Sequence, residues 1–205
     1  KDNAGHEGVI GPGGIQWMTA GKGIVHSEMP EQEDGMLEGF QLWVNLPADH
    51  KMDEAAYQEY SSENIPVEAR DGGIEIRVIT GVTSRGTKGP VVQPMTEPLY
   101  LDVRVPAGQE FIEPLPASRN AFVYIISGPV NTGNEAGEII QLNRDDLGVF
   151  TQGEVVRLQA GENGAHFLVI AGKPLGEPVA RAGPFVMNTK AEVQQAFEDY
   201  RLGKF

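Results

Sequence analysis

The sequence predicts an all-β fold that closes with one α-helix, and three features lead to this prediction. Short apolar segments with strand-like alternation recur along the 205 residues. The 26 glycines and 14 prolines fall largely between these segments, as the turns of a barrel or jelly-roll require. A segment near the end has the spacing of an amphipathic helix. A chain of this length can form two domains of about 100 residues, so we expect two β-barrels and a helix.

The first barrel is assigned to residues 1–80, and a connecting loop to residues 81–97. A Gly-Pro-Gly turn at 11–13 precedes the first predicted strand, because glycine adopts positive φ values without strain. Asp49 is suited to cap a short helix. The predicted elements are strands at Ile15–Thr19, Ile24–Met29, Gly39–Leu46 and Ile74–Ile79, and a short helix at Asp49–Tyr60.

The second barrel is assigned to residues 98–183. Leu99–Val105 alternates strictly between apolar residues and others, as a strand with one buried face does. Ala121–Ile126 is an almost continuous apolar run, which is typical of a buried strand. Further strands are predicted near 138–142, 147–150, 154–158 and 165–171.

Residues 184–205 are expected to contain the helix. Thr189 and Glu192, three positions apart, fit a capping box. One face of the helix is apolar, so we expect it to pack on a barrel, and docking to a partner protein is the alternative. The apolar positions are Val193, Ala196, Phe197 and Tyr200.

The chain is acidic, since 16 Lys and Arg against 29 Asp and Glu give a net charge of −13. Proteins bind nucleic acid mainly by neutralising phosphates with basic side chains, so direct nucleic-acid binding is not expected. No apolar run approaches the roughly 20 residues of a membrane helix. The chain has no cysteine, which fits a reducing compartment. We expect a cytoplasmic protein without a membrane partner, and a nuclear location is the alternative in a eukaryote.

The segment GKGIVHSEMP (21–30) holds the most informative pair of side chains. His26 and Glu28 are two positions apart on a predicted strand, so both point to the same face. An imidazole nitrogen with a carboxylate oxygen suits a divalent transition metal such as iron, manganese, nickel or zinc. Taken alone, such a pair is more often a solvated pair at a strand edge, and both interpretations stay open at this point.

The other histidines and the tryptophans have plainer interpretations. His166 lies alone among apolar residues and is interpreted as packed and hydrogen-bonded, while His50 is expected to be exposed. His6 precedes the Gly-Pro-Gly turn and is the weakest candidate for an added ligand. Trp17 and Trp43 are expected in the core rather than stacked on a ligand, and the alternative for Trp17 is a place at the mouth of the pocket.

Four segments together resemble the pirin family, whose members are two-domain proteins of the cupin superfamily. The resemblance implies two cupin-type (jelly-roll) β-barrels, a metal site in the first and none in the second. The segments are GGIQWMTAGKGIVHSEMP (13–30), GFQLWVNLP (39–47), PLYLDVRV (98–105) and GPFVMNT (183–189).

The resemblance implies a site for Fe(II), or another divalent transition metal, held by three histidines and one glutamate. His26 and Glu28 match two of these ligands. The other two come from a His-x-His motif that has no counterpart in this chain. We therefore expect an incomplete first barrel with half of the metal site, in a chain that is part of a longer protein.

The resemblance also implies an activity, that of a quercetin (flavonol) 2,3-dioxygenase-type oxidoreductase. Its partners would be a flavonol-like small molecule and dioxygen, and Glu28 would act as the base that accepts the substrate hydroxyl proton. An alternative is an iron-dependent regulatory module, such as a transcription co-regulator, that binds a protein partner without turnover. A third interpretation is that the chain, in this truncated form, is a metal-free remnant without activity.

Overall fold

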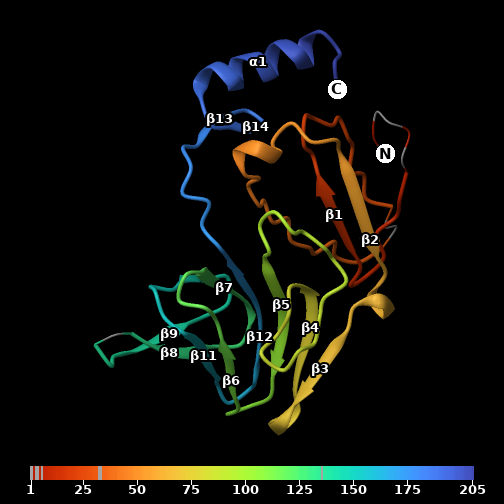
Figure 1. The fold of residues 1–205 in the computed structure, drawn as a ribbon. Coiled ribbons are helices and arrows are strands. Elements are labelled where there is room, and N and C mark those ends of the chain that lie inside the picture. Colours follow the sequence, from red (N-terminus) through yellow and green to blue (C-terminus); the bar gives the residue numbers. More distant parts are fainter. Residues whose placement is uncertain (1, 3–4, 6, 32–33, 135) are drawn as a thin grey trace. The chain divides into compact units, whose positions relative to one another are not determined.

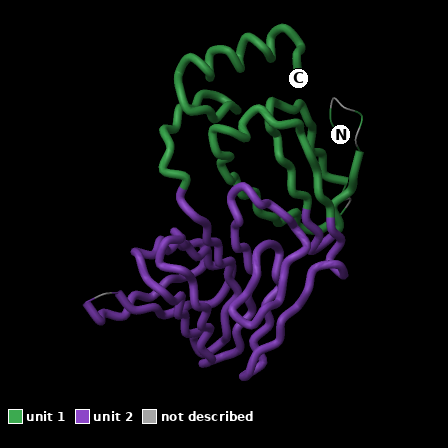
Figure 2. Tube along the Cα trace, in the orientation of Figure 1, with its two compact units in different colours: residues 1–11, 16–59, 175–205 green, residues 12–15, 60–174 purple. Residues whose placement is uncertain are grey.

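In the residues that it describes, the computed structural model is mostly β-sheet with one α-helix near the end, as predicted (Figure 1). It describes residues 2, 5, 7–31, 34–134 and 136–205. Its contacts divide the chain into two compact units (Figure 2), which are residues 1–11, 16–59 and 175–205 for the first and residues 12–15 and 60–174 for the second.

The second unit is built from two antiparallel sheets. One has six strands in the order β10-β7-β12-β5-β4-β3, and the other has four in the order β6-β11-β8-β9. Short 3-10 helices at Ser62–Asn64 and Asp71–Gly73 flank β3. The strands are β3 (Val67–Arg70), β4 (Ile74–Thr80), β5 (Leu99–Val105), β6 (Glu110–Pro114), β7 (Asn120–Ser127), β8 (Val130–Gly133), β9 (Ile139–Leu142), β10 (Leu147–Val149), β11 (Val155–Ala160) and β12 (Ala165–Gly172).

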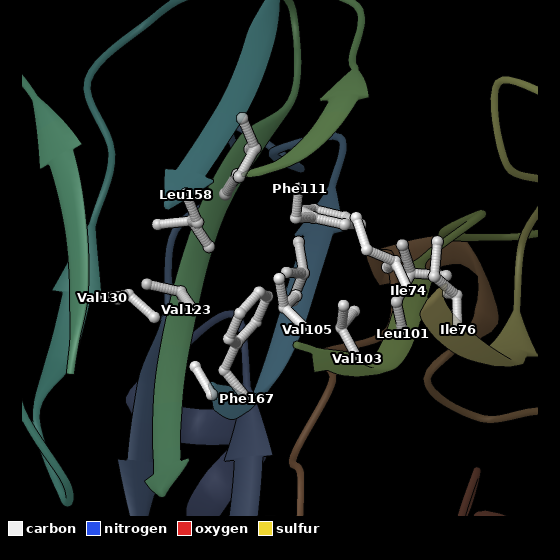
Figure 3. Packing of buried hydrophobic residues seen from close by; sticks show 14 of the residues in the cluster. Ile74, Ile76, Leu101, Val103, Val105, Phe111, Val123, Val130, Leu158 and Phe167 are labelled. Carbon is white, nitrogen blue, oxygen red and sulfur yellow. The ribbon is translucent and has the colours of Figure 1, made fainter. Parts of the chain in front are cut away.

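The core of this unit lies where apolar side chains of the two sheets point toward one another (Figure 3). The strict alternation predicted for Leu99–Val105 is confirmed, because every second residue of β5 is buried. Phe111 of β6 and Phe167 of β12 meet edge to face, with ring centroids 5.6 Å apart. Edge-to-face packing is a favoured arrangement of aromatic rings. The two rings therefore join the sheets at the centre of the unit.

A buried charged cluster ties the loop after β4 to the sheets. Arg70 Nε lies 2.6 Å from Glu68 Oε1, and Arg70 Nη2 lies 2.5 Å from Glu113 Oε2. These three side chains are only 6%, 6% and 1% exposed. Thr83 donates a hydrogen bond to Glu68, and the Ser84 backbone N–H donates one of 2.6 Å to Glu113. The charges are paired and hydrogen-bonded, as buried charges must be.

The first unit contains fewer regular elements. Thr189 and Glu192 form the predicted capping box at the start of the helix. Among the residues that the structure describes, no helix is long and apolar enough to cross a membrane. The elements outside the second unit's two sheets are β1 (Ile15–Thr19), a 3-10 helix (Ala48–His50), β2 (Ala56–Tyr60), β13 (Ala180–Ala182), β14 (Phe185–Met187) and α1 (Lys190–Arg201), with β1 paired to β2 and β13 to β14.

Three local predictions are wrong. Ile24–Met29 and Gly39–Leu46 do not form strands, although an isolated antiparallel bridge joins His26 to Asp2. A strand needs a hydrogen-bonded neighbour along its length, and no described strand pairs with these two segments. Asp49–Tyr60 is not a helix, because its second half, with two tyrosines, pairs with β1 as strand β2.

The compact units do not follow the predicted domain limits. Strands β3 and β4 pair in the same sheet as β5, although they precede residue 81. Residues 175–205 belong to the unit that contains residues 16–59. The predicted domain limits therefore stay a prediction; they are 1–80, 81–97, 98–183 and 184–205.

Candidate functional site

The structure brings His26 and Glu28 together. His26 Nε2 lies 3.6 Å from Glu28 Oε1, although the segment that carries them is extended without being a regular strand. The two side chains are 31% and 66% exposed, so a ligand from solvent can reach both. The spacing of two positions in extended backbone accounts for this proximity.

A tight glycine turn precedes the pair. The Lys22 backbone N–H donates a 2.9 Å hydrogen bond to the Asp53 carbonyl, and Lys22 Nζ lies 2.5 Å from Glu54 Oε1. Gly21 has φ of 52°, and a Cβ there would lie 2.0 Å from the same Asp53 oxygen. Only glycine fits this position, since it needs a left-handed backbone and direct contact with another backbone segment.

Tyr57 of β2 lies near several carboxylates, and Glu28 is one of them. Burial raises the pKa of Tyr57 to about 12, and a hydrogen bond with Asp2 and the charges of Asp2, Glu59 and Glu28 add to this effect. The phenol therefore stays protonated near neutral pH. The negative charges that disfavour a phenolate would attract a metal cation. No pattern in the sequence points to Tyr57, because its proximity to Glu28 depends on how β2 packs.

The pair fits two ligands of one metal ion, but the described residues do not complete a site. Protein nitrogen and oxygen ligands lie about 2.0–2.2 Å from zinc, so two donor atoms 3.6 Å apart can contact the same ion. Within the described ranges, no group of three or more His, Cys, Asp or Glu residues could hold a metal. His6, the weakest candidate for a further ligand, lies outside the described residues.

The remaining histidines have structural partners. His166 Nε2 lies 2.6 Å from Asp102 Oδ1, which confirms that His166 is packed and hydrogen-bonded. Burial alone would raise the pKa of Asp102, but hydrogen bonds from His166 and Arg77 hold it below its ordinary value. His50 Nδ1 lies 2.7 Å from Asp53 Oδ2 at an exposed position, as predicted.

The two tryptophans differ in their surroundings. Trp17 on β1 is half-buried, in keeping with the expected packing role. Trp43 is 65% exposed, so its predicted place in the core is wrong. The segment 39–46 that carries Trp43 forms no strand, so the alternation that would bury the ring is absent. The ring instead lines an open cavity of about 490 Å³ together with Arg181 and Val186.

Comparison with known proteins identifies the family. A family model described as the pirin C-terminal cupin domain matches residues 100–205, and one described as pirin matches residues 1–44. A pirin-like protein of Caulobacter vibrioides is 51% identical over 100% of this chain and 72% of its own length. The chain belongs to the pirin family. Rat pirin is 43% identical over 100% of the chain and 69% of its own length.

Solved structures agree with this pirin assignment. A crystal structure of quercetin 2,3-dioxygenase from Acinetobacter baumannii is 33% identical and covers 100% of this chain. The TM-score is 0.86, and the match takes in 71% of that dioxygenase chain. The cupin fold of this pirin-family chain is therefore supported by an experimental structure.

Proposed function

We propose that this pirin-family chain provides part of a metal-dependent oxidoreductase site of the quercetin 2,3-dioxygenase type. His26 and Glu28 are the two proposed ligands, with Fe(II) as the proposed metal. The observation that carries the proposal is the 3.6 Å distance between His26 Nε2 and Glu28 Oε1. The likeness to the dioxygenase of Acinetobacter baumannii supports the reaction class.

In this proposal the two side chains have distinct roles. His26 is neutral when it binds, because a protonated Nε2 has no lone pair for a metal. Glu28 Oε1 binds the metal, and the Glu28 carboxylate also accepts the proton of a flavonol hydroxyl, as a general base does. The metal, when bound, supplies the oxygen chemistry that amino-acid side chains lack. The exposure of Glu28 lets the substrate hydroxyl approach its carboxylate.

An iron-dependent interaction module without turnover is the second candidate. The segment after Glu28 exposes the apolar side chains of Met29, Met36 and Leu37. Apolar side chains favour contact with another protein where they gather into one exposed patch. In this candidate His26 and Glu28 still bind the metal, and the metal shapes the surface that the partner contacts.

The test compares turnover with metal content in the natural full-length protein. Under air, the iron-loaded protein is expected to bleach the absorbance of quercetin. Glu28→Gln should lose far more rate than iron. An amide oxygen can ligate weakly but cannot accept the proton, so the rate should fall by about 10²–10⁴. Glu75→Gln, at an exposed position of β4 in the second unit, is the matched control and should behave as the wild type.

Two results separate the candidates. If the iron-loaded protein consumes no oxygen with any flavonol, yet captures a defined partner only when iron is present, the interaction module replaces the dioxygenase. If Glu28→Gln turns over quercetin at the rate of the Glu75→Gln control, the general-base role is wrong even when the enzyme is active.

A further inference from the structure

Phe205 lies directly on the glycine turn that leads into His26. A Cβ at Gly23 would be 2.7 Å from Cγ and Cδ1 of the Phe205 ring, closer than any ordinary van der Waals contact. Gly23 also has φ of 136°, a conformation that other residues rarely adopt. Only two residues, Ile24 and Val25, separate this contact from His26. The ring thus meets the backbone three positions before His26 and can influence where His26 lies.

The Phe205 ring is held in place by other aromatic side chains. Its centroid lies 5.9 Å from that of Phe185 on β14 and 6.1 Å from that of Tyr200 on α1. Phe185 packs in turn edge to face on Phe197, at 4.8 Å. Aromatic rings at these separations attract one another. We call these four side chains the aromatic cluster.

The segment that carries the aromatic cluster is anchored within the first unit. Lys51, a buried lysine, donates from Nζ to the Val186 carbonyl at 3.4 Å. The Ala48 backbone N–H donates to Glu177 Oε2 at 2.8 Å, and Asn188 Nδ2 donates to the same oxygen at 3.1 Å. These contacts fix β14 and the start of α1, and through them the cluster.

Backbone hydrogen bonds also hold the glycine turn. The Asp53 carbonyl accepts from the Lys22 N–H, and the Gly23 N–H donates to the Ala20 carbonyl at 3.0 Å. The turn is therefore in contact with the backbone at Asp53 and, at Gly23, with the ring of Phe205.

We infer that Phe205 is a positioning residue of the metal site. By pressing on Gly23 it fixes the direction of residues 24–28 and thereby keeps His26 Nε2 and Glu28 Oε1 within reach of one ion. Metal ligands must be held within about 0.5 Å of their productive geometry by the residues that support them. The inference rests on the proposed function, because it takes His26 and Glu28 as ligands.

The test measures Fe(II) affinity by chelator competition under anaerobic conditions, in the natural full-length protein. Phe205→Ala is expected to weaken Fe(II) binding at least tenfold and to speed amide hydrogen exchange at residues 24–28. Phe205→Leu, which restores apolar bulk over Gly23, should recover part of the affinity. Leu202→Ala is the matched control, since it removes apolar bulk near the same end of the chain from a residue that is 57% exposed and lies outside the aromatic cluster. It should change Fe(II) affinity less than twofold.

Gly23→Ala probes the same contact from the other side. It should weaken Fe(II) binding in the wild type and at least threefold less in the Phe205→Ala background, because the ring that its methyl group meets is gone. Equal losses in both backgrounds would overturn the inference, as would Phe205→Ala with wild-type affinity and exchange. If His26→Ala retains its iron, the proposed function fails. If His26→Ala loses iron while Phe205→Ala does not, only the role of Phe205 fails.

Discussion

Replacing Arg70 with methionine is expected to destabilise the second unit strongly. The guanidinium is the cationic partner of two carboxylates, Glu68 at 2.6 Å and Glu113 at 2.5 Å, which are only 6% and 1% exposed. Removing one partner of a buried ion pair costs about 3–5 kcal/mol, because the other charge stays buried without compensation. In a chain of this size each kcal/mol lowers Tm by about 2–4 °C, so Tm should fall by roughly 6–20 °C.

The loss should depend on pH. Burial alone would raise the pKa of Glu68, but hydrogen bonds from Thr83 and Arg70 hold it below its ordinary value. Glu68 therefore stabilises the wild type above the ordinary pKa of a glutamate, and this contribution is lost as the pH falls through the lower, folded-state pKa. Without Arg70, Glu68 loses one of the hydrogen bonds that hold its pKa low. The difference between wild type and Arg70→Met should consequently narrow as the pH falls below the ordinary pKa of a glutamate.

Urea and thermal unfolding, followed by circular dichroism, measure this difference. Arg157→Met is the matched control, because Arg157 pairs with Glu110 at 2.7 Å with a side chain that is 55% exposed. A surface pair of this kind contributes about 0–1 kcal/mol. The reasoning is refuted if Arg70→Met destabilises the protein no more than Arg157→Met, or if its effect grows as the pH falls.

Two further predictions concern the same unit. Phe111→Ala removes a fully buried ring that meets Phe167, so the free energy of unfolding in urea should fall by about 3–5 kcal/mol; a loss below about 1 kcal/mol would show that the core refills the space. Asp102→Asn removes a carboxylate whose pKa is held low by His166 and Arg77. In the wild type, the stability that this carboxylate contributes is lost as the pH falls below the ordinary pKa of an aspartate, and the variant should largely lack this loss. Acid unfolding curves of equal shape for the two proteins would contradict this.

The parts of the fold that the sequence predicts are those with local signals. Strict alternation in Leu99–Val105 requires one buried face, and the structure buries it. The Thr189–Glu192 capping box depends only on residues three positions apart, and it forms as expected. The strands predicted between 138 and 171 are also present, because turn residues mark their ends.

The parts that the sequence does not predict depend on distant partners. Gly39–Leu46 alternates like a strand, yet it forms none without a neighbour among the described residues. Arg70 and Glu113 are 43 positions apart, so no spacing rule could pair them. At the candidate site, the two-residue spacing anticipates that His26 lies beside Glu28. The contact of Phe205 with Gly23 has no local signature, because it depends on how the aromatic cluster packs.

The most direct test of the account is to locate the metal. Crystals of the natural full-length protein loaded with Fe(II) would be measured on both sides of the iron absorption edge, so that anomalous differences identify the ion. The account predicts one iron peak about 2.0–2.2 Å from both His26 Nε2 and Glu28 Oε1, the range of nitrogen and oxygen ligands at comparable metal sites. An iron peak elsewhere, with both of these atoms free of metal, would contradict it.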